Sequence, residues 1–91
     1  MADLTRAEII KLIAVATRPL NLTGVDLTGV DLSNLDLREA NLSRANLSQA
    51  NVKGTLFLKA LLDETNFTKA TGLEFSQMNL AHIKNCKGIR Y

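Results

Sequence analysis

The 91-residue sequence predicts an all-β solenoid, in which the chain winds into stacked coils behind one short N-terminal helix. Three observations predict this fold. Residues 20–69 divide without a gap into ten consecutive blocks of five residues. The middle residue of every block is apolar, whereas an average composition would make only about half of these positions apolar. Turn-forming pairs such as Thr23-Gly24 follow the middle residue in many of the blocks.

A period of five residues fits neither a single helix nor a straight strand. Five residues turn an α-helix through about 500°, so the repeated apolar positions would spiral around its axis. In a straight strand, an odd period would point successive apolar residues to opposite faces. The chain must therefore bend once in every block. If each bend is close to a right angle, four blocks close one coil of about twenty residues, and coils stack about 4.8 Å apart.

Each block has an inward and an outward pattern. The middle residue and the small residue two places before it share one face of a short extended segment, and the residue between them points away. We expect the middle residues to be buried; they are Leu22, Leu27, Leu32, Leu37, Leu42, Leu47, Val52, Phe57, Leu62 and Phe67. Asn or Asp usually stands between the two inward positions. Columns such as Asp26, Asn46 and Asn66 should satisfy turn backbone or solvate the surface.

Three consecutive triplets connect this repeat to a known family. Ala40-Asn41-Leu42, Ala45-Asn46-Leu47 and Ala50-Asn51-Val52 follow the tandem pattern A-(D/N)-L-x-x, and the sequence therefore resembles the pentapeptide-repeat family. The resemblance covers more than half of the chain. It implies a right-handed quadrilateral β-helix, here of about three coils, with the middle residues packed inside. Because such proteins are abundant in cyanobacteria, it also points to a cyanobacterial source.

Residues 5–17 are expected to form a helix that covers the first coil. Thr5 and Glu8 have the spacing of a capping box, Ile9 begins an apolar stripe, and Pro19 marks the end of the helix. A solenoid needs such a cover because its end coils otherwise expose core and unpaired strand edges. The alternative is attachment to a membrane surface. A cap explains the same pattern, so we expect no membrane binding.

The repeat is interrupted in residues 70–91. Thr71 and Gly72 break the phase, the register shifts by three residues, and three degenerate blocks follow. The expected centres of these blocks are Phe75, Leu80 and Asn85. We expect residues 73–85 to continue or close the stack and residues 88–91 to form an irregular end.

Length, charge and cysteine content limit the function classes. Residues 1–91 should form one domain, since so short a chain cannot support two cores. The formal net charge of +2 is too small to indicate a nucleic-acid partner. A single cysteine, with no secretory signal and no apolar run long enough to span a membrane, predicts a cytoplasmic protein.

No catalytic residue, metal site or cofactor is expected. His82 is the only histidine and lies in no metal-binding motif, so we interpret it as a surface residue. Cys86 follows an expected block centre by one place, which predicts an outward and unreactive thiol. Gly24, Gly29 and Gly54 occupy repeat turns and form no phosphate-binding loop.

The most unusual segment is residues 55–62. Leu56 and Leu61 replace the usual Asn or Asp, and Leu58 occupies another outward position, so three leucines should face solvent on adjacent sides of one coil. Exposed apolar clusters commonly mark interfaces. The C-terminal tail could instead fold back over them. Leu56, Leu58 and Leu61 are the candidate interface, either for an unknown protein partner or for self-association.

The sequence therefore predicts a non-enzymatic protein-interaction or scaffolding module. The resemblance offers one alternative, a DNA-mimicking regulator of DNA gyrase, because the family includes quinolone-resistance proteins of that kind. The short chain and its net positive charge disfavour this alternative. Nucleic-acid binding by the basic residues Lys84, Lys87 and Arg90 is not favoured either.

Overall fold

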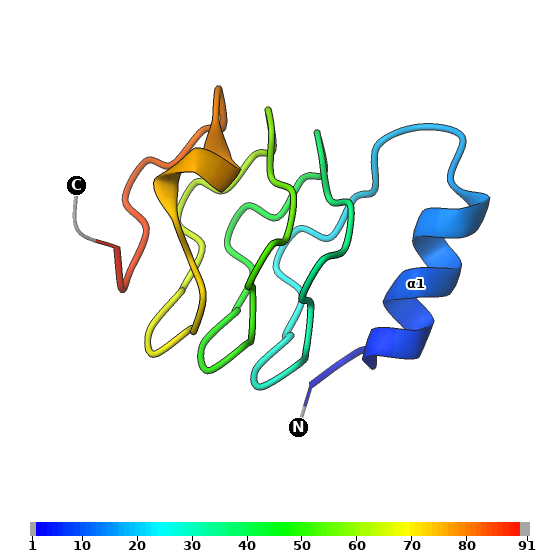
Figure 1. The fold of residues 1–91 in the computed structure, drawn as a ribbon, viewed down its shortest axis with the longest axis horizontal. Coiled ribbons are helices and arrows are strands. Elements are labelled where there is room, and N and C mark those ends of the chain that lie inside the picture. The colour runs from blue at the N-terminus through cyan, green and yellow to red at the C-terminus, as the bar shows by residue number, and fades with distance from the viewer. Residues whose placement is uncertain (1, 90–91) are drawn as a thin grey trace.

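The computed structural model describes residues 2–89, which form one end helix followed by a stack of coils (Figure 1). The helices are α1 (Arg6–Val15) and the short 3-10 helix η1 (Phe75–Met78). Within this part of the chain, the extended segments make isolated parallel β-bridges. None of these segments within residues 2–89 forms a strand of several residues. The bridges stay isolated because the chain turns again after every fifth residue.

The bridges fix the length of one coil at twenty residues. Asn21, Asp26, Asp31 and Asp36 each bridge a residue twenty places later; their partners are Asn41, Asn46, Asn51 and Leu56. Backbone hydrogen bonds follow the same columns, and the Leu27 N–H, for example, donates to the Asn46 carbonyl at 2.8 Å. Four bridge columns of this kind describe four sides, as the five-residue period predicted.

The inward residues of the blocks form one continuous core. All of the middle residues from Leu22 to Phe67 are buried, as expected, with exposed fractions of 6% or less. The small residues that precede them are buried in the central coils. Two of these are polar, and their hydroxyls are satisfied inside: Thr55 donates to the Leu32 carbonyl at 2.7 Å and Thr65 to the Leu42 carbonyl at 2.8 Å.

The Asn and Asp residues between the inward positions fasten the turns. The Asn46 side-chain oxygen accepts the Ser48 N–H at 2.9 Å, and the same bond recurs in neighbouring blocks. Asn46 is half-buried, because its side chain lies along the turn and not straight out into solvent. The last residue of each turn adopts a left-handed backbone even where it is not glycine, as at Glu39 with φ 64°.

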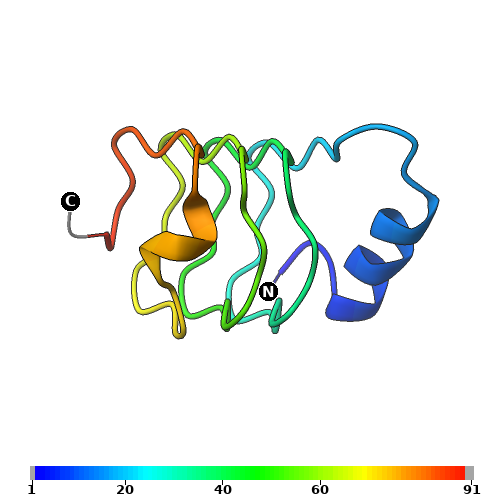
Figure 2. The same ribbon diagram turned by 45° about the horizontal axis from the view of Figure 1, so that its top comes forward.

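α1 lies at the N-terminal end of the stack (Figure 2). Thr5 and Glu8 form the expected capping box, in which the Glu8 N–H donates to the Thr5 hydroxyl and the Thr5 N–H donates to the Glu8 carboxylate. Ile9 is fully buried. Arg6 ties the helix to the first coil by donating from Nη1 to the Asp31 and Ser33 carbonyls, each at 3.0 Å.

The register break in residues 70–91 is one residue long, and the expected shift of three residues is wrong. Asn51 bridges Thr71, twenty residues later. Leu61, by contrast, bridges His82, twenty-one residues later. One extra residue is therefore accommodated before His82, in the stretch that contains the left-handed Gly72 (φ 80°) and η1.

This shorter shift changes which C-terminal residues point inward. Met78 is 5% exposed and Ile83 is half-buried, and these two take the places of block centres. The expected centres are wrong: Phe75 is 54% exposed, Leu80 is 66% exposed and Asn85 is exposed. The single-residue insertion places them in turns or on the outer surface. The stack nevertheless continues beyond residue 70, with its next coil formed in this new register.

Candidate interaction surface

We define the leucine patch as Leu56, Leu58 and Leu61. These residues lie at outward positions of two successive blocks. Leu56 pairs with Asp36 in its bridge column and is 44% exposed, as the sequence predicts. Leu58 and Leu61 are half-buried. The patch is therefore less exposed than expected, since Leu56 is the one of its three side chains that is exposed and not half-buried.

The C-terminal tail lies beside the leucine patch as the next coil. The Phe57 N–H donates to the Gln77 carbonyl and the Lys59 N–H to the Asn79 carbonyl, each at 3.0 Å. These are the bonds that one coil makes to the next along the whole solenoid. Up to Ile89, the tail thus leaves Leu56 exposed.

Two further apolar residues of this next coil are exposed, and the sequence reasoning missed them. Leu80 follows Asn79, which is paired with Lys59, and Phe75 begins η1. The sequence pattern predicts both as buried block centres, because it indicates a register shift of three residues and not one. The signal that could have found them is the triplet Ala81-His82-Ile83, which repeats the small, polar, apolar order of the regular blocks.

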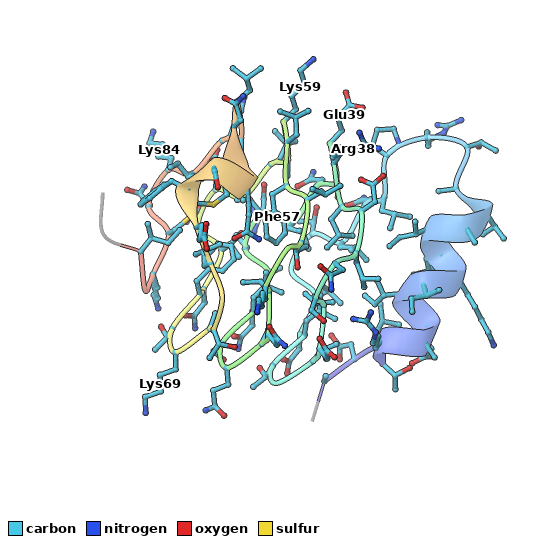
Figure 3. All side chains as sticks on the ribbon, viewed as in Figure 1. Arg38, Glu39, Phe57, Lys59, Lys69 and Lys84 are labelled. Atoms are coloured by element: carbon cyan, nitrogen blue, oxygen red, sulfur yellow. The ribbon has the colours of Figure 1, made fainter. Side chains whose placement is uncertain are left out.

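A groove of about 500 Å³ borders the leucine patch on its N-terminal side. One wall is the loop that follows α1, residues 16–20, and the other is formed by residues 36–40 and 58–59. Leu58 belongs to both the groove and the patch. Figure 3 shows Arg38 and Glu39 next to the loop after α1, with Lys59 on the following coil.

Arg38 and Asp36, which both line this groove, form an ion pair with each other. The Arg38 guanidinium donates from Nε to Asp36 Oδ1 at 2.8 Å and from Nη2 to Oδ2 at 2.7 Å. These bonds lower the pKa of the Asp36 carboxyl and raise the pKa of the Arg38 guanidinium. The bidentate geometry uses both carboxylate oxygens. Asp36 therefore contributes little free negative charge to the groove.

The residues considered for chemistry do not assemble into a site. His82 is exposed, and no three His, Cys, Asp or Glu side chains within residues 2–89 lie close enough together to hold a metal ion. Cys86 is 8% exposed, so its predicted outward position is wrong. The one-residue register shift places it at a small inward position, where Sγ donates to the Leu62 carbonyl at 2.9 Å.

The bridge columns and five-residue blocks define a repeat protein of the solenoid class. The family model for pentapeptide repeats matches residues 21–57 and 40–83, with eight copies of the repeat. The chain therefore belongs to the pentapeptide-repeat family. This membership implies a right-handed quadrilateral β-helix, a handedness that the five-residue period does not determine.

The chain resembles the solved structure of HetL over most of its length. HetL is a pentapeptide-repeat protein involved in heterocyst differentiation regulation, from the cyanobacterium Nostoc sp. strain PCC 7120. It is 27% identical over 74% of this chain, with a TM-score of 0.65. The match spans only 27% of HetL itself. No curated protein sequence matches this chain.

The family also bears on the class of activity. Pentapeptide-repeat proteins are generally structural or interaction proteins without catalysis. In the described part of the chain, neither helix has the length and apolar character needed to cross a membrane.

Proposed function

We propose that this chain is a non-enzymatic protein-interaction or scaffolding module, which binds a protein partner or a second copy of itself through the leucine patch. The observation that carries the proposal is Leu56, which stands 44% exposed where the repeat otherwise places Asn or Asp. A polar residue at this position fastens the turn. Leucine cannot make that bond, so its presence there needs another explanation.

Burial of the leucine patch by a bound partner would explain why leucine occupies these three outward positions. Removing a leucine side chain from water stabilises a complex by roughly 1.5–3 kcal/mol when burial is complete. Leu80 and Phe75 are also exposed in the next coil. Exposed apolar clusters on small proteins commonly mark interaction sites. The involvement of HetL in heterocyst differentiation regulation supports a module that acts by contact and not by chemistry.

We also propose a domain organisation, a source and a location. Residues 1–91 form one domain, and α1 covers its first coil. Residues 20–69 supply the regular repeats, and residues 70–91 end the stack. The lone cysteine fits a reducing compartment such as the cytoplasm. The cyanobacterial origin of HetL supports a cyanobacterial source.

Replacing Leu56 and Leu61 with Asn tests the interface. Asn is the residue that the repeat favours at both positions, so the double variant L56N/L61N should stay folded. It should lose self-association, measured by light scattering, or lose the proteins that the wild type retains from an extract of its host. Val15→Asn is the matched control, because Val15 is 74% exposed on α1, away from the patch.

Two results would contradict the proposal. A double variant with unchanged mass, melting temperature and bound proteins would show that the leucines are merely exposed. A less stable monomer with loosened residues after 71 would show that they pack the tail.

Inhibition of DNA gyrase remains the alternative, and a supercoiling assay with purified gyrase separates the two. The family resemblance motivates it, whereas the mixed charges of the surface oppose a mimic of duplex DNA. Dose-dependent inhibition, or protection from a gyrase drug, would favour the alternative over the leucine patch.

A further inference from the structure

The groove beside the leucine patch has the size and walls of a binding site. Its volume of about 500 Å³ lies in the range of known ligand sites. Its apolar lining includes Ile13, Pro19 and Leu20 on one wall and Leu37 and Leu58 on the other. A ligand held between these walls would bury apolar surface on both sides.

Part of the backbone along the groove is already paired. The Glu39 N–H donates to the Leu58 carbonyl at 2.9 Å, and the Ala40 N–H donates to the Leu37 carbonyl at 3.1 Å. The Arg38 N–H donates to the Asp36 side chain at 3.1 Å. The charged and apolar side chains of the lining supply the chemistry of recognition.

The charges that remain in the groove favour an anion. Arg18, Arg38 and Lys59 line it together with two acidic residues. Arg38 neutralises Asp36, as described above. Arg18 and Lys59 form no ion pair among the residues that the structure describes. Outside the Asp36–Arg38 pair, Glu39 is the remaining carboxylate of the lining. Two unpaired cations against one carboxylate leave an excess of positive charge.

We propose that this groove binds an extended segment of the protein partner, in which a carboxylate between Arg18 and Lys59 is flanked by apolar side chains. The inference rests on the proposed function and names the chemistry of the partner. Leu58 is shared by groove and patch, so a ligand that fills both must be elongated. The carboxylate fixes its direction, and the apolar side chains cover Leu58 and Leu56.

Selection from random dodecapeptides displayed on phage tests this inference. Peptides enriched on the wild type should contain Asp or Glu next to apolar residues. The variant R18E/K59E should bind the same peptides about tenfold or more weakly and should enrich Lys or Arg instead. Glu at residue 59 fits its left-handed turn, because Glu39 and Glu64 occupy the equivalent turn position with the same backbone.

The variant K69E/K84E is the matched control, with the same change in net charge at other turns of the solenoid. It should enrich the wild-type peptides with unchanged affinity. A synthetic copy of an enriched peptide should shift the amide resonances of residues 16–20, 36–40 and 58–59. Thermal melts of R18E and K59E singly separate a loss of binding from a loss of folding.

Several outcomes would overturn the inference. They are an absence of enriched peptides, enriched peptides without acidic residues, equal binding to R18E/K59E, and shifts confined to another surface. This failure is distinguishable from failure of the proposed function. If L56N/L61N loses the partner while R18E/K59E keeps it, the patch is an interface and the groove is not part of it. If only R18E/K59E loses binding, the groove acts without the patch.

Discussion

Outside the leucine patch, the Asn or Asp that precedes each buried middle residue contributes one oxygen to the turn after it. In Asp26, Oδ1 accepts the Thr28 hydroxyl at 2.6 Å and the Thr28 N–H at 2.9 Å. Asn46, in the same column, accepts the Ser48 N–H in the same way. An amide and a carboxylate both offer this oxygen, which explains why the columns mix Asn and Asp. The two differ in that only Asp titrates.

The stability of the folded protein at low pH should therefore depend on the Asp residues and not on the Asn residues at these positions. Bonds from the Thr28 hydroxyl and N–H lower the folded-state pKa of Asp26 below its ordinary 3.8. The resulting stabilisation is complete above pH 3.8 and is lost as pH falls through the lowered pKa. Asp26→Asn keeps the side-chain oxygen that accepts from Thr28 but cannot be protonated. Its melting temperature should therefore fall less than that of the wild type between about pH 5 and about pH 2.

Circular dichroism melts across this pH range provide the measurement. The reverse change, Asn46→Asp, is the matched control and should make the protein more sensitive to acid. If Asp26→Asn and the wild type lost stability in parallel, the Asp26 carboxylate would not be linked to folding.

At the scale of elements, the regular coils could be predicted from the sequence and their end could not. Every block repeats one local geometry, so periodicity alone identified the middle residues as buried. After Ala70, apolar residues are present in two competing registers, one through Phe75 and Leu80 and the other through Met78 and Ile83. Only packing against the preceding coil decides between them. The misplacement of Cys86 follows from the same error.

For the candidate interaction surface too, one part could be predicted from the sequence and another could not. Leu56 was found because it breaks a local pattern, and such a break is visible in the sequence. The groove was not found, because it depends on the approach of residues 16–20 to two different coils. No spacing in the sequence encodes that approach.

Gly72 is the turn on which the register change depends. Its φ is +80°, and a Cβ on it would lie 2.6 Å from the Lys53 Cα and 2.7 Å from the Lys53 backbone nitrogen. Gly72→Ala should therefore cost about 2 kcal/mol or more, since both the left-handed backbone and the backbone contact oppose it. Urea unfolding measures the cost.

Gly24→Ala is the matched control for this change. Gly24 has a similar φ of +69°, but a Cβ there would meet nothing within 4 Å. Only the backbone conformation opposes this substitution, so it should cost about 1 kcal/mol. Equal costs at the two glycines would show that the contact with Lys53 plays no part.

At the scale of the whole molecule, the stack has one shared core and little stability to lose. Leu47 is fully buried in the second coil, between residues of the first and third coils. Leu47→Ala should cost about 2–5 kcal/mol, a large part of the roughly 5–15 kcal/mol typical of a domain. Because each coil supports its neighbours, we expect the chain to melt at lower temperature in a single transition.

Circular dichroism and amide hydrogen exchange should report this loss together. Leu56→Ala is the control, because it removes the same atoms from an exposed position and should change stability by about 0.5 kcal/mol or less. A Leu47→Ala protein that melted within about one degree of the wild type would not fit a core role for Leu47.

The twenty-residue spacing of the bridges also constrains how such a chain can change length during evolution. Duplication of residues 40–59 would add one whole coil and leave every later side chain on its original side. Duplication of a single block would rotate everything after it by a quarter turn, so any surface built from two coils would be scrambled. A lone extra residue is accommodated near Gly72, where η1 replaces a regular turn. Lineages of this architecture should therefore gain and lose sequence in whole coils, with smaller insertions confined to such irregular stretches.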